Sequence, residues 1–423
     1  MPRPADSKPL QAPRTGYPGI ERGTPLYVHV PFCAAKCTYC DFFSVVAHGH
    51  DLEASVELLL AEAHSRLPGD PLEPSTVFLG GGTPSLLPSR LLVRLLDGLD
   101  QLTRFRSSAV EVTAECNPES LDRAKARQLV ELGVTRVSIG FQSLQSDVLR
   151  LFGRVHTVAQ SFRAYEAARA AGVPEVNIDL IYAIPGQSSG QWERDLREVL
   201  ALGPDHLSAY NLTFEEETPL RRWMEGGRLN QAVLDEAVEL ELFDLTRSIA
   251  GELAYEAYEI SNYARDGKRC LHNINYWSNG RYLGIGPSAV SKIGHRRMGN
   301  PRSLEEWRRG VVTSSTTPGT TGAEEWSEIL DPLARLGETW WLGLRMTQGV
   351  DPRAARAAAG YGGAGRPDPA EQKARQLAAR DLLELRDRRW RLTERGLPVA
   401  DRIGTEFLDL TSMATAKLQE SAG

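Results

Sequence analysis

The sequence predicts an α/β protein with a parallel sheet, followed by a mainly helical C-terminal region. The first observation is that strand-like and helix-like segments alternate through six strands between Leu26 and Leu212. Parallel neighbours need crossover helices, so this alternation favours a parallel sheet. The second is composition, because 41% hydrophobic and 25% charged residues in a chain of 423 are typical of globular proteins. The pattern leaves open a doubly wound sheet and a barrel, complete or partial.

Each predicted strand is a short run of apolar or β-branched residues. The predicted strands are 26–30, 76–79, 109–114, 136–141, 175–182 and 206–212. The predicted helices, with apolar residues at helical spacing, are 51–67, 88–102, 121–132, 158–171 and 190–202. Asp51 is placed to cap the first of these helices, and Gly133 and Gly172 to end two others. Function is expected on the loops that follow the strands, at the carboxyl ends of a parallel sheet.

The chain divides into four predicted segments. Residues 1–23 are rich in Pro and polar residues and form a disordered leader, without the apolar stretch of a secretory signal. Residues 24–250 hold the alternating core, and 251–322 form a Gly-, Asn- and Tyr-rich extension. Residues 323–423 form a C-terminal domain, in which a helix, the hairpin-like LELRDRRWRLTERG and another helix are winged-helix-like.

Charge, hydropathy and cysteine content exclude several classes of protein. The net charge of −6 gives no general reason to expect nucleic acid as a partner. No apolar run approaches the ~20 residues of a membrane-spanning helix, so a cytoplasmic location is expected. The five cysteines are an odd number, which argues against a disulfide framework.

The strongest local signal is Cys33-Ala-Ala-Lys-Cys37-Thr-Tyr-Cys40, directly after the first predicted strand. Thiolates bind soft metals well. A structural zinc site and an ordinary electron-transfer cubane each need four ligands, whereas only three thiols are local here. Three thiolates on one short loop instead indicate a [4Fe–4S] cluster with one iron left open to a small chelating ligand.

This C-x3-C-x2-C spacing, with an aromatic residue before the last Cys, resembles the radical S-adenosylmethionine (SAM) superfamily. In that superfamily SAM chelates the open iron, and one electron can cleave it to a 5′-deoxyadenosyl radical. The Gly80–Gly82 loop resembles the superfamily loop that contacts the methionyl amino group, and glycines let the backbone approach a ligand closely. Asp179 lies inside an apolar strand and needs a partner or a ligand. An ion pair with Arg154 and a polar belt around SAM are both compatible with the sequence.

Five motifs, found one after another between about Leu26 and Gly299, narrow the resemblance to one family within the superfamily. YVHVPFCAAKCTYCDF, FLGGGTPSLL, SIGFQS, NIDLIYAIPGQ and GIGPSAVS together resemble the oxygen-independent coproporphyrinogen III oxidase family. The resemblance implies a partial (β/α)6 radical SAM barrel with a C-terminal extension. The SAM contacts that it implies are Tyr27, Tyr39, Gly81, Gly82, Thr83, Glu115, Gln142, Arg154, Asp179 and, as a weaker match, Thr213.

Within this family, three features separate the decarboxylating enzymes from a sister group of radical SAM heme chaperones. The enzymes carry a fourth cysteine where this chain has Phe42, and a structured N-terminal arm where this chain has a short polar leader. The motif HNINYW, from His272 to Trp277, is characteristic of the chaperones. The resemblance therefore implies a chaperone that binds heme and delivers it to an acceptor protein. The alternative is an oxygen-independent coproporphyrinogen III dehydrogenase that oxidatively decarboxylates propionates.

His272 is the predicted heme ligand, because imidazole is the commonest proximal ligand of heme iron. Tyr276, Trp277 and Tyr282 offer aromatic surface nearby, although an ordinary packed histidine has such neighbours too. The implied cofactors are a [4Fe–4S] cluster and SAM, with heme as cargo. The implied partners are a membrane-associated heme acceptor, an electron donor such as flavodoxin or ferredoxin, and a second copy of the chain in a homodimer. An RNA-modifying radical SAM enzyme is disfavoured, because the pI is about 5.9 and no RNA-binding module is added.

Overall fold

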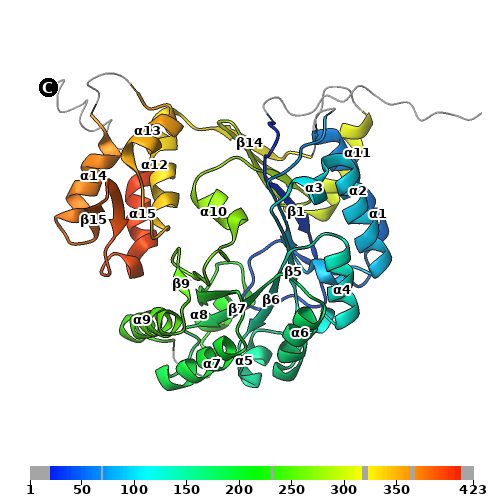
Figure 1. The fold of residues 1–423 in the computed structure, drawn as a ribbon, viewed down its shortest axis with the longest axis horizontal. Coiled ribbons are helices and arrows are strands. Elements are labelled where there is room, and N and C mark those ends of the chain that lie inside the picture. Colours follow the sequence, from blue (N-terminus) through cyan, green and yellow to red (C-terminus); the bar gives the residue numbers. More distant parts are fainter. Residues whose placement is uncertain (1–19, 68–69, 230–232, 317–322, 363–366, 411–423) are drawn as a thin grey trace, which may run out of the picture.

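The structure is a computed structural model that describes residues 20–67, 70–229, 233–316, 323–362 and 367–410. Its main element is a nine-stranded sheet that curves into a partial barrel (Figure 1). In order across the sheet, the strands are β11 (Leu283–Ile285), β1 (Leu26–Val30), β4 (Thr76–Gly81), β5 (Glu111–Cys116), β6 (Arg136–Gln142), β7 (Glu175–Tyr182), β8 (His206–Asn211), β10 (Asn262–Ala264) and β9 (Glu256–Ala257). The strands from β11 to β8 are parallel, and β10 and β9 add an antiparallel edge. The predicted α/β class with a parallel sheet is confirmed.

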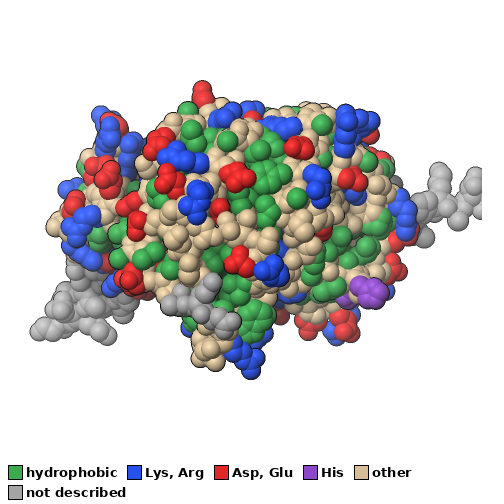
Figure 2. Space-filling view, turned by 90° about the horizontal axis from the view of Figure 1, so that it is seen from below, with side chains coloured by type: hydrophobic (Ala, Val, Ile, Leu, Met, Phe, Trp, Pro, Cys, Tyr) green, Lys and Arg blue, Asp and Glu red, His purple; other side chains and the backbone are tan. Residues whose placement is uncertain are grey.

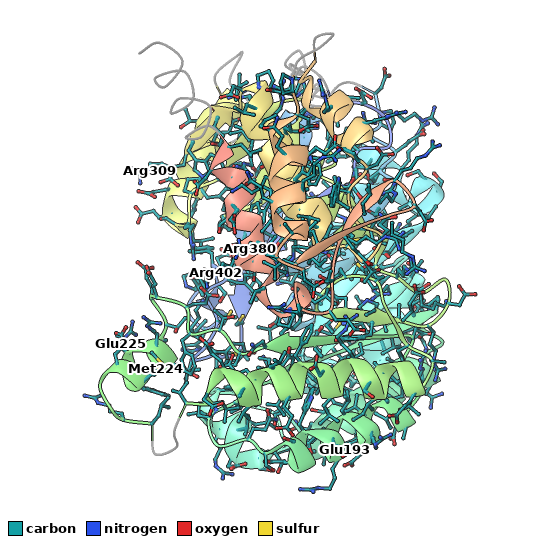
Figure 3. All side chains as sticks on the ribbon, turned by 90° about the vertical axis from the view of Figure 1, so that its left-hand side faces the viewer. Glu193, Met224, Glu225, Arg309, Arg380 and Arg402 are labelled. Carbon is teal, nitrogen blue, oxygen red and sulfur yellow. The ribbon has the colours of Figure 1, made fainter. Side chains whose placement is uncertain are left out.

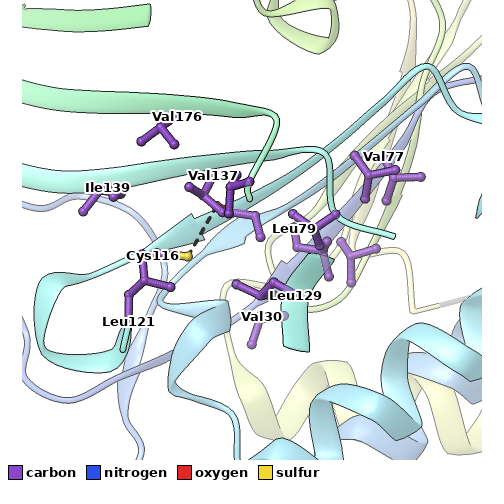
Figure 4. Packing of buried hydrophobic residues seen from close by; sticks show 14 of the residues in the cluster. Val30, Val77, Leu79, Cys116, Leu121, Leu129, Val137, Ile139 and Val176 are labelled. Carbon is purple, nitrogen blue, oxygen red and sulfur yellow. Dashed lines mark hydrogen bonds between the residues drawn. The ribbon is translucent and has the colours of Figure 1, made fainter. Parts of the chain in front are cut away.

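Helices cover the outer, convex side of the sheet (Figure 1). They are α1 (Leu52–Arg66), α2 (Ser89–Thr103), α4 (Arg123–Glu131), α6 (Val158–Ala170), α7 (Ser189–Ala201) and α9 (Glu236–Glu252). Asp51 caps α1 as predicted, since its carboxylate accepts a hydrogen bond from the amide of Ala54. The apolar faces of these helices and the strands share one large buried cluster. Figure 4 shows part of it, with Cys116 packed among Leu121, Val137 and Ile139.

Shorter elements complete the sheet side of the molecule. They are β2 (Phe32–Cys33), β3 (Val45–Val46), α3 (Phe105–Ser108), α5 (Ser146–Leu151) and α8 (Pro219–Glu225), with single 3-10 turns at 84–86 and 118–120. β2 and β3 pair in parallel, Phe32 with Val45 and Cys33 with Val46. This pairing holds together the two ends of the three-cysteine loop. The loop is therefore held in shape from both ends.

Residues 251–322 extend the sheet. β11 pairs in parallel with β1, and β10 pairs with β8. A second, three-stranded sheet follows, of β12 (Val290–Ile293), β13 (Arg296–Gly299) and β14 (Trp326–Ile329), with α11 (Leu304–Thr316) between β13 and β14. The sequence pattern did not indicate these strands, which are only two to four residues long. Since this segment shares the large buried cluster, the fold joins it to the core, and the predicted domain bounds remain predictions.

A buried ion pair ties this segment to α1. Arg66 and Glu62 lie 2.8 Å apart and are almost fully buried. Arg66 also donates to the carbonyl of Gly284, while Glu62 accepts from the indole of Trp307 and from the amide side chain of Asn300. Further hydrogen bonds to both groups help such a pair to persist in the interior.

The C-terminal region is mainly helical and has its own buried cluster. Its elements are α12 (Pro332–Leu344), α13 (Pro352–Ala359), α14 (Pro369–Ala378), β15 (Leu383–Arg386), β16 (Arg389–Leu392), a 3-10 turn at 397–399 and α15 (Ala400–Leu408). Trp340 stacks on Phe407 at the centre of that cluster, with ring centroids 5.2 Å apart. The predicted hairpin is present, with β15 and β16 antiparallel. Arg380 and Arg402 lie on this region, as Figure 3 shows.

One short helix, α10 (Leu271–Trp277), lies on the inner side of the sheet, between it and the C-terminal region (Figure 1). Figure 2 shows acidic and basic side chains interleaved over one face of the molecule, which is a mixed surface and not a basic one. Within the described ranges, no helix has both the length and the apolar character needed to cross a membrane.

Candidate functional site

A cavity of about 720 Å³ lies on the inner side of the parallel strands. We call it the main cavity. It brings together all the residues that the sequence assigned to the cluster and to SAM. These are Tyr27, Cys33, Cys37, Tyr39, Cys40, Gly81, Gly82, Thr83, Glu115, Gln142, Arg154, Asp179 and Thr213. They come from loops and strands spread over almost 190 positions of the sequence, so the fold assembles one site from separate motifs.

The three-cysteine loop is anchored at several points. The amide of Thr38 donates to the carbonyl of Phe152 at 3.0 Å, and the amide of Leu220 donates to the carbonyl of Thr38 at 2.9 Å. Tyr39 packs on Phe152, with ring centroids 4.7 Å apart. These contacts hold the loop against α5 and α8, so its thiols are presented in a fixed arrangement at the main cavity.

The donor set fits a cluster better than a single metal ion. All three thiols of the loop are free, and all three line the main cavity. Within the described part of the chain, no three His, Cys, Asp or Glu side chains are grouped closely enough for a single-ion site. A cubane cluster, by contrast, is held by thiolates spread around a larger body. Cys33, Cys37 and Cys40 therefore fit the predicted role.

Cys116 and Cys270 also border the main cavity, but both are buried. Burial raises the pKa of each thiol to about 12. Both also stand apart from the loop that carries the other three thiols, Cys116 at the end of β5 and Cys270 at the start of α10, so they are poor candidates for ligands. Their surroundings explain them as packing residues: Cys116 lies in the buried cluster, and the Cys270 thiol lies 3.5 Å from Glu111.

Two glycines are required where the backbone enters the main cavity. Gly81 has a φ of +100°, and a Cβ there would meet the His29 ring at 2.5 Å. A Cβ on Gly82 would meet the backbone of Phe32 at 2.7 Å. Gln142, at the end of β6, has a φ of +66°, which is strained for a residue with a side chain. Strained backbone concentrates at functional sites, and here it turns Gln142 toward the cavity.

Two half-buried acids, Glu115 and Asp179, lie in the main cavity without an ion-pair partner among the described residues. Burial raises the pKa of Glu115 to about 8, with Asp179 adding repulsion. The Glu115 carboxyl accepts a hydrogen bond from the amide of Gly81 at 3.1 Å. Such a pair is stabilised by a positively charged ligand, and SAM carries positive charge on its sulfonium and amino groups.

The ion pair between Asp179 and Arg154, which the sequence left open, is not formed. Asp179 accepts instead from the Ser138 hydroxyl at 2.8 Å and from Asn177 at 2.7 Å. Arg154 donates instead to Asn117 and to the carbonyl of Gly140. The hydrogen-bond donors to Asp179 are therefore uncharged, and its negative charge remains available to a ligand.

A hydrogen-bond chain links two of the cluster thiols. Thr83 donates to the Cys33 Sγ at 3.7 Å, and Arg154 donates to the Cys37 Sγ at 3.5 Å. Asn117 joins the two donors, because its Nδ2 donates to Thr83 at 2.8 Å and its Oδ1 accepts from Arg154 at 2.6 Å. Sequence reasoning missed Asn117, although it directly follows β5, where a polar side chain is a signal.

His272 does not occupy the position expected of a heme ligand. It is fully buried and does not line the main cavity. Its Nδ1 is 2.8 Å from the Thr76 hydroxyl and its Nε2 is 3.0 Å from the Tyr276 hydroxyl. Its backbone amide donates to Glu111 at 3.0 Å. With both ring nitrogens bonded, neither is open to an iron in this conformation, and His272 instead anchors α10 to the sheet.

Comparison with known proteins places this site in a family. Residues 27–199 match the model of the radical SAM superfamily, and residues 330–399 match the HemN C-terminal domain. The chain is 34% identical over 400 residues to the heme chaperone HemW of Mycobacterium tuberculosis, covering 93% of this chain and 96% of that protein. The chain belongs to the HemW family of radical SAM proteins. The HemW of Synechocystis is also 34% identical, over 77% of this chain and 79% of that protein.

Two other relatives extend the comparison. The bovine protein named radical S-adenosyl methionine domain-containing protein 1, mitochondrial, is 34% identical over 82% of this chain and 78% of its own length. Among solved structures, the coproporphyrinogen III oxidase HemN of Escherichia coli superposes with a TM-score of 0.77. The superposition covers 93% of this chain and 91% of HemN at 22% sequence identity, which shows a shared fold. The partial barrel with a mainly helical C-terminal region is confirmed.

We predict that replacing Asn117 by Ala lowers the reduction potential of the cluster. Hydrogen bonds to the thiolates stabilise the more negative, reduced state, and Asn117 holds both donors in place. Losing about 1 kcal/mol of this stabilisation corresponds to roughly 40 mV for one electron. A redox titration followed by EPR measures it. Asn211, which lines the same cavity on β8, is the control, and an equal shift in Asn211→Ala would contradict the role.

Proposed function

We propose that this protein is a heme chaperone, which binds heme and passes it to an acceptor protein. The observation that carries the proposal is Phe42, which stands where the decarboxylating enzymes have a fourth cysteine. Its side chain is 69% exposed and lines the main cavity. A phenyl ring has none of the acid–base, ligand or redox chemistry of a thiol. The names of the HemW relatives support the same function.

Membership of the radical SAM superfamily implies a [4Fe–4S] cluster and SAM. Cys33, Cys37 and Cys40 would hold the cluster, and the bound pair would supply one-electron chemistry at the main cavity. Gly81 and Gly82 let the backbone approach SAM, while Glu115 and Asp179 balance its positive charge. The remaining contacts assigned to SAM are Tyr27, Tyr39, Thr83, Gln142, Arg154 and Thr213.

The proposal extends to partners and location. The heme acceptor, an electron donor of the flavodoxin or ferredoxin type, and a second copy of the chain are its expected partners. Its expected location is the cytoplasm, where free thiols stay reduced. The partners are those that the resemblance to the heme chaperones implies, and the location is the one expected from the composition of the chain.

The alternative function is oxygen-independent coproporphyrinogen III dehydrogenase. The fold shared with HemN is compatible with it. The experiment that separates the two uses one anaerobically reconstituted preparation in two assays. We expect heme to bind with a Soret shift and to move to a heme-free acceptor protein, and coproporphyrinogen III to remain unchanged. Formation of protoporphyrinogen, with SAM consumed, would reverse the ranking. A Phe42→Cys variant tests whether the missing thiol alone withholds the activity.

A further inference from the structure

A cavity of about 530 Å³ lies between the edge of the large sheet and the C-terminal region, and it shares no lining residue with the main cavity. Its walls come from α9, from β9, from the turn that follows α12 and from β16. We call it the arginine pocket, because Arg247, Arg269 and Arg391 line it. Thr347 also lines it and ties its two sides together, since its amide and its hydroxyl donate to the carbonyl of Tyr258 at 3.1 and 3.2 Å.

The lining of the arginine pocket carries a net positive charge, because its three guanidinium groups are accompanied by one acidic side chain, Glu256. Glu256 pairs with Arg269 at 2.8 Å. Asp387, which is not part of the lining, lies 3.6 Å from Arg391. The two acidic side chains are 67% and 77% exposed. Exposed pairs of this kind are weak, so both arginines can exchange their partners for a ligand.

Arg247 forms no ion pair with any described residue. Its neighbours are the Phe243 ring, whose centroid lies 5.6 Å from the guanidinium carbon, and the Tyr263 hydroxyl. The Nη1 of Arg247 and the Nε of Arg391 are both buried, and neither has a hydrogen-bond acceptor in the part of the chain that the structure describes. Buried donors of charged groups are costly to leave unpaired and are uncommon in folded proteins. The positive charge of the pocket is therefore left uncompensated by the protein itself.

We propose that the arginine pocket binds a phosphate-type anion that carries at least two negative charges, a site that goes beyond the proposed heme function. Such a charge balances three guanidinium groups and one carboxylate. Phosphate fits better than a carboxylate, because its oxygens lie in several directions and can accept from guanidinium groups on three separate segments. Since the walls belong both to the sheet edge and to the C-terminal region, the bound anion also holds these two parts together.

Calorimetric titration of the full-length reconstituted protein tests the site, with inorganic phosphate, pyrophosphate and ADP at constant ionic strength. Iron content is measured before and after each titration, so that removal of the cluster by the anion is not mistaken for binding. We expect saturable binding of at least one of the three. If ADP binds no more tightly than pyrophosphate, the site recognises the phosphate groups alone, and tighter binding of ADP identifies a nucleotide as the source. The absence of saturable binding of any of them would overturn the proposal.

Two variants, each with a matched control, locate the anion. Arg247→Gln and Arg391→Gln remove one positive charge each, while Arg163→Gln and Arg402→Gln do so at exposed positions of α6 and α15, the second of which Figure 3 labels. We expect each pocket variant to weaken anion binding about tenfold, the size of effect that 1.4 kcal/mol gives, and the controls to leave it unchanged. Circular dichroism checks folding.

Thermal unfolding provides a second measurement that does not depend on heats of binding. A ligand that binds only the folded chain raises the unfolding temperature. The anion at saturating concentration should therefore raise it by a few degrees in wild type and in both controls, and by less in the two pocket variants. If Arg247→Gln does not fold, Arg391→Gln decides alone, since 25% of the Arg391 side chain is exposed. Wild-type affinity in the folded pocket variants would overturn the site. Equal weakening by the controls would also overturn it, because the loss would then reflect overall charge.

Discussion

Replacing Cys33, Cys37 or Cys40 by Ala, one at a time, should abolish the reconstituted iron–sulfur chromophore. The loop supplies three thiolates and no fourth, so the loss of one leaves two ligands for a four-iron cluster. Cluster stability depends steeply on the number of thiolates, and we expect the iron and sulfide content to fall to roughly a tenth of wild type or less. The measurement is iron and acid-labile sulfide analysis with EPR of the reduced protein after anaerobic reconstitution.

The matched controls are Cys116→Ala and Cys270→Ala. Both residues border the same cavity, yet both are buried and lie outside the three-cysteine loop, Cys116 at the end of β5 and Cys270 at the start of α10. We expect full cluster content in both variants, with the cost limited to packing. Equal loss of iron in either control would mean that the cluster draws on a fourth thiol of this chain, and the three-ligand assignment would be wrong.

Replacing His272 by Ala should destabilise the protein strongly without removing a heme ligand. The imidazole is fully buried and satisfies the hydroxyls of Thr76 and Tyr276, which the variant would leave unpaired beside a new cavity. We expect a loss of about 3 kcal/mol in the free energy of unfolding, measured by urea titration of the cluster-free protein. His48→Ala, at an exposed position, should change it by less than about 0.5 kcal/mol.

The heme spectrum of the folded His272→Ala variant distinguishes two roles for His272, a structural anchor for α10 and a ligand of the heme iron. If the residue is an anchor, the Soret band of bound heme keeps its position, even where a loosened Tyr276 weakens the affinity. A displaced band in a folded variant would restore His272 as the iron ligand and would require the α10 helix to rearrange when heme binds.

The same histidine should make stability depend on pH. Burial lowers the pKa of His272 to about 3 in the folded chain, whereas an unfolded histidine has a pKa of about 6.5. Between these values the unfolded state binds a proton that the folded state does not, so stability falls as pH falls. Each such histidine contributes a slope of up to about 1.4 kcal/mol per pH unit. His29, with its pKa lowered to about 4, and the buried His206 act in the same direction. Urea unfolding at pH 7, 6 and 5 should therefore show a shallower slope in His272→Ala, and an unchanged slope would contradict the assigned burial.

Six of the seven parallel strands in the described sheet, and their helices, could be predicted from the sequence because their signals are local. β7, for example, is an eight-residue strand rich in β-branched and aliphatic residues whose predicted and observed bounds agree, and α1 begins where Asp51 caps it. The residues of the main cavity were predictable for a related reason. A parallel sheet brings the loops after its strands to one side, so motifs that follow successive strands meet there.

Only the tertiary structure decided how the remaining elements and side chains pair. β11 is three residues long, and nothing within Leu283–Ile285 indicates that it lies beside β1, since strands this short are stabilised by the partner and not by their own pattern. Asp179 and Arg154 could have paired by charge, but hydrogen bonds from Ser138 and Asn177 hold one while Asn117 holds the other. His272 is a third case in which the sequence was not enough. The motif draws attention to the residue, but only its contacts with Thr76 and Tyr276 indicate that it positions helix α10. The physical reason is common to all three: a side chain's partner depends on which groups the fold brings within hydrogen-bond distance, and this information is spread over distant parts of the chain.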